Sequence, residues 1–183
     1  FYGNGITNVN IFDPEVAGTG DDTVQYIYTI TSTVCADTAT SITTVNDLPL
    51  PYFDAQDKYC SNGSPVQLTG QPSGGQFTGP NISGTDVATF TPTPGIIGEN
   101  TISYTYMDGN GCVNTYDHQL EVTQVANVGI ESIEAGYCIN ADSIELRGEI
   151  FGSFEGKGNF SGPGITDHIT DDGIGYLIPS DAG

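Results

Sequence analysis

The chain of 183 residues has no tryptophan, a single methionine and only three Lys or Arg residues. Against 23 Asp and Glu residues, this gives a net charge of −20 at pH 7. Binding to nucleic acid requires a basic surface, so this scarcity of positive charge excludes a nucleic-acid partner. The acidity also opposes binding to anionic lipid, and the apolar runs are too short to cross a bilayer. We therefore expect no direct insertion into a membrane.

The sequence also lacks an initial methionine and a signal peptide with a basic and then an apolar region. We expect the chain to be a fragment or a processed piece of a larger protein. None of the four cysteines forms a Cys-x-x-Cys pair, so neither a zinc site nor a redox motif is indicated. Localisation must therefore be inferred from composition and from how the cysteines pair.

What the sequence does contain is an internal repeat. The pattern Phe-x-Gly-x-x-Ile-Ser/Thr begins at Phe1, Phe77 and Phe160. The Tyr-Cys pair at Cys60 recurs 78 positions later at Cys138, and the third copy carries extra residues around 149–157. A period this long suits a small domain strung in tandem. We predict three parts: the C-terminal part of repeat 1 (1–47), a complete repeat 2 (48–125) and the N-terminal part of repeat 3 (126–183).

Each repeat shows strand periodicity. Apolar or aromatic residues alternate with polar ones at Val24, Tyr26 and Tyr28, and again over 102–106. This period of two predicts strands, and one polar face favours antiparallel pairing. No window has a convincing helical period, and turn sequences such as Asp108–Gly111 separate the runs. Several short strands with closely spaced turns predict an all-β chain of tandem immunoglobulin-like β-sandwich repeats.

A core of about 78 residues is marginal without further support. Four cysteines allow three pairings, and the repeat phase favours Cys60–Cys112, which are 52 positions apart inside the complete repeat. Such a bond would stabilise the fold by roughly 4 kcal/mol. Cys35 and Cys138 would then be unpaired within this chain. A structural disulfide would imply an oxidising, extracellular setting.

The block formed by Tyr59-Cys60, Phe77-x-Gly-Pro, Phe90-x-Pro, Tyr104-x-Tyr and Gly111-Cys112 resembles a known family. It is similar to the PKD-like, immunoglobulin-like repeats of very large Bacteroidota cell-surface proteins, including the gliding-motility adhesin exported by type IX secretion. The resemblance covers essentially the whole chain. Repeat 1 departs from it with Val34-Cys35 in place of Gly-Cys, so we expect a looser turn there.

The resemblance implies a structural and adhesive stalk of a filament outside the cell, acting in surface adhesion or gliding motility. Its partners would be neighbouring repeats of the same chain and a surface polysaccharide or other substratum. The alternative is a carbohydrate-binding or spacer module of a secreted multidomain hydrolase. Asp followed by Ser or Thr and an apolar residue also resembles the O-glycosylation motif of that phylum, which predicts modification at Thr23, Thr38 and Ser143.

Other site hypotheses are weaker. Asp108–Gly111 lacks the acid that a calcium loop needs at its twelfth position, so a hairpin turn is the better interpretation. Acid pairs at 21–22 and 171–172 are best explained as solvated charge, with weak Ca²⁺ binding as the alternative. His118 and His168 fall in different repeats and neither recurs. We expect no enzyme active site, no bound cofactor and no specific metal site, and we interpret the repeated tyrosines as core residues rather than as a sugar platform.

Overall fold

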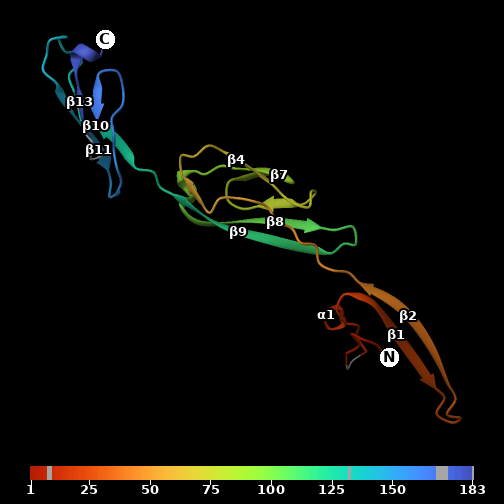
Figure 1. The fold of residues 1–183 in the computed structure, drawn as a ribbon. Coiled ribbons are helices and arrows are strands. Elements are labelled where there is room, and N and C mark those ends of the chain that lie inside the picture. The colour runs from red at the N-terminus through yellow and green to blue at the C-terminus, as the bar shows by residue number, and fades with distance from the viewer. Residues whose placement is uncertain (8–9, 132, 168–172, 183) are drawn as a thin grey trace. The chain divides into compact units, whose positions relative to one another are not determined.

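A computed structural model describes residues 1–7, 10–131, 133–167 and 173–182 (Figure 1). The chain divides into two compact units, Phe1–Thr123 (unit 1) and Gln124–Gly183 (unit 2). Almost all of the regular structure in the described residues is β-strand, which confirms the predicted all-β class.

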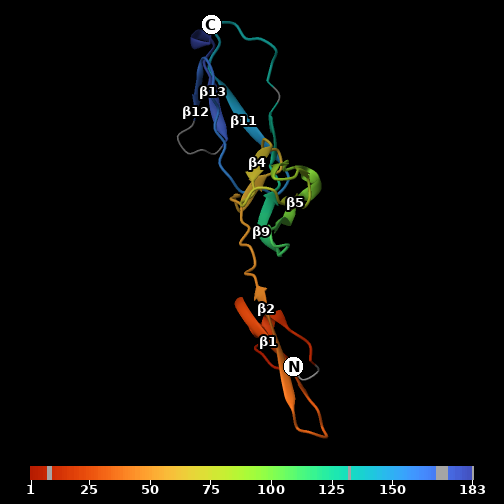
Figure 2. The ribbon, with the colours of Figure 1, turned by 90° about the vertical axis from the view of Figure 1, so that its right-hand side faces the viewer.

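The middle of unit 1 is a two-layer sandwich (Figure 2). One sheet has the order β3-β9-β8-β5 and the other has the order β4-β7-β6. A 3₁₀ helix, η1 (Pro94–Ile96), leads into β8. The strands are β3 (Lys58–Cys60), β4 (Val66–Thr69), β5 (Gln76–Thr78), β6 (Ile82–Gly84), β7 (Val87–Phe90), β8 (Gly98–Met107) and β9 (Val113–Thr123).

The core of this sandwich comes from alternate positions of facing strands, as the sequence periodicity predicted. Ile102 and Tyr104 of β8 are completely buried, while their neighbours Ser103 and Thr105 are more exposed. The buried apolar cluster comprises Phe53, Tyr59, Leu68, Phe77, Ala88, Phe90, Ile102, Tyr104, Leu120 and Val122. The strand pairs are antiparallel with one exception, because β3 lies parallel to β9.

The first part of unit 1 is a long hairpin of β1 (Gly20–Thr29) and β2 (Ala36–Val45), preceded by the short helix α1 (Pro14–Ala17). Its pairing follows that of β8–β9: Gly20 is opposite Val45, and Gly98 is opposite Val122. The turn between β1 and β2, for which the sequence predicted a looser conformation, is one residue longer than the turn between β8 and β9. Its closing hydrogen bond runs from Ile30 N–H to the Cys35 carbonyl, whereas that of β8–β9 runs from Asp108 N–H to the Cys112 carbonyl. Unlike β8–β9, this hairpin has most of its side chains exposed.

Unit 2 has one described sheet, in the order β10-β11-β13-β12, followed by a 3₁₀ helix, η2 (Pro179–Asp181). Its last three strands pair in the register of β4-β7-β6: Ile144 is opposite Leu177, as Val66 is opposite Phe90. The strands are β10 (Asn127–Ile130), β11 (Ile144–Phe151), β12 (Ile165–Asp167) and β13 (Ile174–Leu177).

The Phe-x-Gly motif forms the same turn at each of its three occurrences. Its fifth residue is Gly5, Asn81 or Gly164, with φ of 74°, 52° and 67°. The carbonyl of that residue accepts a hydrogen bond from the backbone N–H of Asp13, Thr91 or Ile178, respectively. A positive φ favours glycine. At Asn81 the side-chain amide supports the turn by donating to the Thr91 carbonyl at 3.1 Å.

Candidate functional site

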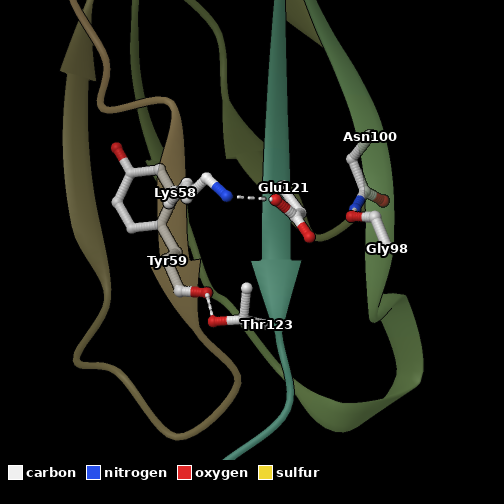
Figure 3. A network of polar contacts seen from close by, with 6 residues as sticks. All are labelled: Lys58, Tyr59, Gly98, Asn100, Glu121 and Thr123. Carbon is white, nitrogen blue, oxygen red and sulfur yellow. Dashed lines mark hydrogen bonds and ion pairs between the residues drawn. The ribbon is translucent and has the colours of Figure 1, made fainter.

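The parallel pair β3–β9 is the first candidate site. Lys58, Tyr59 and Cys60 lie opposite Glu121, Val122 and Thr123 (Figure 3). Backbone bonds of 2.8 Å extend the pairing at both ends, from Glu121 N–H to the Asp57 carbonyl and from Ser61 N–H to the Thr123 carbonyl. The sandwich is therefore closed by a ladder between its first strand and its last strand.

Side chains on the outward face reinforce this ladder. Lys58 Nζ lies 2.8 Å from Glu121 Oε2, and the hydrogen bond to Glu121, followed by its charge, raises the pKa of Lys58. Both side chains are well exposed, so water and salt screen this pair and it adds little to stability. Thr123 Oγ1 donates to the Tyr59 carbonyl at 3.2 Å. On neighbouring β8, the Asn100 amide donates to the Gly98 carbonyl at 2.8 Å (Figure 3).

The chain enters and leaves the sandwich at opposite ends of β9. Asn114, near the start of β9, donates from its amide to the Pro49 carbonyl at 2.9 Å. Residues 49–60 therefore run beside β9 from its beginning to its end at Thr123, where the chain leaves. A force applied at these two points acts along the strands, so it loads the hydrogen bonds of the ladder together rather than one after another.

A second feature is the pocket that holds Tyr104. Its hydroxyl accepts a hydrogen bond from Gly75 N–H at 2.9 Å and has two acceptors in reach, the Pro72 carbonyl at 2.7 Å and Asp86 Oδ1 at 3.1 Å. Burial is the largest cause that raises the pKa of Tyr104, and the hydrogen bond and charge of Asp86 raise it further. The ring fits only because position 70 is glycine: a Cβ on Gly70 would lie 2.1 Å from Tyr104 Cζ. Here a fully buried tyrosine joins the two sheets.

The predicted Cys60–Cys112 disulfide is wrong for this structure, in which all four cysteines are free. Cys60 lies opposite Thr123 at the end of β9, whereas Cys112 immediately precedes its first residue. The ten residue steps of β9 from Val113 to Thr123, at about 3.3 Å each, already span roughly 33 Å. A disulfide needs Cα atoms within about 7 Å. Cys35 and Cys138 are free as well. The disulfide thus gives no support to an extracellular setting.

The remaining residues predicted as sites do not lie together in one site. Thr23 in β1, Thr38 in β2 and Ser143 just before β11 are exposed, and their modification stays a prediction. His118 is mostly covered and lies with Nε2 3.4 Å from Asp57 Oδ1, while His168 falls outside the described residues.

No group of three metal-ligating side chains occurs among the described residues. Asp108 closes its turn by accepting from the N–H groups of Asn110 and Cys112, both at 2.9 Å. Asp21 and Asp22 do not form such a group; the acids at 171–172 lie outside the described part of the chain.

Sequence reasoning missed both the parallel ladder and the tyrosine pocket. Alternation predicts strands but not which strands pair, so nothing placed Cys60 beside Thr123. The sequence did contain one signal of the pocket, because glycines recur at equivalent positions of the repeats: Gly70 with Gly148, and Gly75 with Gly158.

No protein-family model matches the chain, and no curated protein matches it at a significant level. In the described residues, no helix is long and apolar enough to cross a membrane.

Proposed function

We propose that this chain is a load-bearing part of a bacterial cell-surface stalk, built from tandem immunoglobulin-like repeats and acting in surface adhesion or gliding motility. The observation that carries the proposal is the β3–β9 ladder, which lies between the points where the chain enters and leaves the sandwich. Hydrogen bonds loaded together resist extension better than bonds that open in sequence. This is the property that a stalk under tension requires.

Two further observations support a repeated stalk. The register of β4-β7-β6 recurs in β11-β13-β12, and that of β8–β9 recurs in β1–β2. A net charge of −20 keeps neighbouring filaments apart and soluble. We place the stalk outside the cell on the sequence resemblance, with neighbouring repeats and a surface polysaccharide or other substratum as its partners.

The test is forced unfolding of the full chain, pulled from its two ends. Thr123→Val removes the hydroxyl that bonds the Tyr59 carbonyl across the ladder. Thr115→Val is the matched control, because it removes the 2.9 Å bond to Thr105 Oγ1 within the β8–β9 hairpin, away from the ladder. Each hydrogen bond contributes about 0.5–1.5 kcal/mol. We expect Thr123→Val to speed forced unfolding of the sandwich by roughly twofold to tenfold.

The control variant should change equilibrium stability by a similar amount but leave the forced-unfolding rate nearly unchanged. Equal effects of the two variants on that rate would show that the ladder does not carry the load, and the stalk proposal would lose its main support.

A further inference from the structure

A mostly buried histidine lies beside the β3–β9 ladder of the middle sandwich. His118 is on the inward face of β9, the face that also carries the core residues Leu120 and Val122. Its side chain is 17% exposed, and its Nε2 atom is buried with no hydrogen-bond partner among the described residues. A buried polar atom without a partner costs free energy. Packing alone therefore does not account for a histidine at this position.

The segment that enters the sandwich covers this histidine. We call residues 49–57 the entry segment. The ring of Phe53 in that segment lies 5.9 Å from the imidazole and 5.5 Å from the Tyr116 ring, measured between ring centroids. At the end of the segment, the carboxylate oxygen Oδ1 of Asp57 lies 3.4 Å from His118 Nε2. The imidazole therefore contacts both the apolar and the acidic part of the entry segment.

Asp57 links this contact to the ladder. Its carbonyl accepts a hydrogen bond from Glu121 N–H at 2.8 Å, and the next residue, Lys58, begins β3 (Figure 3). The Asp57 side chain is 86% exposed, so its carboxylate can move the short distance that separates 3.4 Å from an ordinary hydrogen bond. One residue thus forms a backbone bond at the end of the ladder and also reaches the buried imidazole.

We propose that His118 and Asp57 form a pH-dependent clasp, in which protonated His118 donates from Nε2 to the Asp57 carboxylate and loss of that proton loosens the entry segment. In the protonated imidazole both ring nitrogens are donors, and a bond from such a cation to a carboxylate is strong. Imidazoles change charge between about pH 5 and pH 8. The use of the clasp rests on the proposed load-bearing function, because the clasp would regulate that same ladder.

The groups around the imidazole set the direction of the effect. The entry segment contributes the Asp57 carboxylate, β8 contributes the apolar Ile102 opposite His118, and the same face of β9 carries Tyr116, a residue type that is neutral between pH 5 and pH 8. Burial opposes a charged imidazole, whereas the adjacent carboxylate favours it. The cation nearest in sequence, Lys58, is itself paired with Glu121. The clasp should therefore add stability at acidic pH and be lost as the pH rises through the range in which imidazole releases its proton.

The experiment measures hydrogen exchange of the Glu121 amide in the full chain at about pH 5.5 and about pH 8, where carboxylates stay ionised. Rates are expressed as protection factors, which remove the intrinsic pH dependence of exchange. Asp57→Asn should lower the protection factor by about threefold to tenfold at the acidic pH and change it little at the alkaline pH. In a His118→Gln background, Asp57→Asn should have no pH-dependent effect, because the coupling between the two residues is gone.

Asp117→Asn is the matched control. Asp117 is an exposed acid next to His118 in sequence, but it lies opposite Ser103 on the outward face of β9. Equal effects of Asp57→Asn at the two pH values would overturn the clasp. So would an equally pH-dependent effect of Asp117→Asn, or an undiminished effect of Asp57→Asn in the His118→Gln background. If His118→Gln does not fold, the comparison between the two Asn variants still decides.

Forced unfolding of the full chain at the same two pH values separates the clasp from the stalk proposal. Slower forced unfolding of the wild-type sandwich at acidic pH, with Asp57→Asn insensitive to pH, would support both. A pH-dependent protection factor without any pH effect on forced unfolding would support the clasp and count against a load-bearing ladder. A protection factor that does not depend on His118 and Asp57, while Thr123→Val still speeds forced unfolding, would overturn the clasp alone.

Discussion

At the scale of single residues, the sandwich depends on one polar atom in its core. The Tyr104 hydroxyl meets backbone groups on both sides, Gly75 N–H and the Pro72 carbonyl, so the ring fixes the 72–75 turn against β8. A buried polar atom is costly when its partner is lost. The position therefore demands tyrosine rather than any large apolar residue.

Replacing this hydroxyl gives a prediction with a pH signature. We expect Tyr104→Phe to lower the free energy of unfolding by about 1–3 kcal/mol at neutral pH, because Gly75 N–H and the Pro72 carbonyl lose their partner. Burial raises the pKa of Tyr104 in the folded state. The unfolded chain therefore loses this proton first, near pH 10. The stabilisation from neutral Tyr104 is present below that pH and declines as pH rises through the raised folded pKa.

Urea titrations of both proteins between neutral pH and strongly alkaline pH measure this effect. The difference in stability between wild type and Tyr104→Phe should shrink above about pH 10. A difference that stays constant across that range would mean that the hydroxyl is not the titrating group responsible.

Two equivalent glycines give opposite predictions. Gly70→Ala should destabilise unit 1 by about 3 kcal/mol or more, because the new methyl group would overlap the Tyr104 ring. Gly148→Ala should leave unit 2 within about 0.5 kcal/mol of wild type, because nothing lies closer than 3.6 Å to the added atom. Thermal unfolding of both variants checks the pair. Equal destabilisation would show that a side chain occupies the space beside Gly148 in solution.

At the scale of elements, periodicity predicted the strands well and their partners poorly. Alternation at Ile102, Tyr104 and Tyr106 predicts a strand and its buried face, because side chains of a strand point alternately to its two sides. It contains no information on whether Lys58–Cys60 pairs with the start or the end of β9. That choice depends on the path of the chain after Pro49, and it decides which cysteines can meet.

The separation of the cysteines has a direct experimental consequence. We expect Cys60→Ser to change the free energy of unfolding by less than about 1 kcal/mol. A disulfide closing this loop would instead contribute roughly 4 kcal/mol. Urea unfolding with and without reductant should give the same midpoint, and mass spectrometry after alkylation of the denatured, unreduced chain should find four modified cysteines. A reductant-sensitive midpoint would contradict the structure.

At the scale of the whole molecule, the sheets differ in how much of their surface a second layer covers. The facing sheets of the middle sandwich bury ten apolar residues in one cluster, whereas the described side chains of β1–β2 are mostly exposed and Asp22 is the buried one. A two-stranded hairpin without a covering layer is marginally stable in water. Local stability should therefore vary widely along one chain.

Hydrogen exchange of the dilute full chain should show this contrast. We expect the β8 and β9 amides to exchange slowly, near the rate set by global unfolding of the sandwich, and the β1 and β2 amides to exchange orders of magnitude faster. Because the two hairpins have matching registers, their exchange rates can be compared at equivalent residues. Equal protection of both at low protein concentration would mean that β1–β2 is covered within a single chain.

The limits of the predicted parts, 1–47, 48–125 and 126–183, came from spacing alone and remain a prediction. The spacing of the motifs indicates that residues 1–47 and 126–183 each match only part of the middle segment. It does so because a repeated pattern shows which portion of the repeat each part contains. It could not indicate that a Cβ would have room at Gly148 but not at Gly70, because that depends on a ring contributed by a strand far along the chain.

Gly70 and Gly148 hold equivalent positions in two sheets of matching register, and Tyr104 and Tyr26 hold equivalent positions in two hairpins of matching register. Segments that match this closely can mispair while a chain is refolding, which is a characteristic failure of repeat proteins. The extra residues at 149–157 distinguish one sheet from the other, and removing them should increase mispairing during refolding.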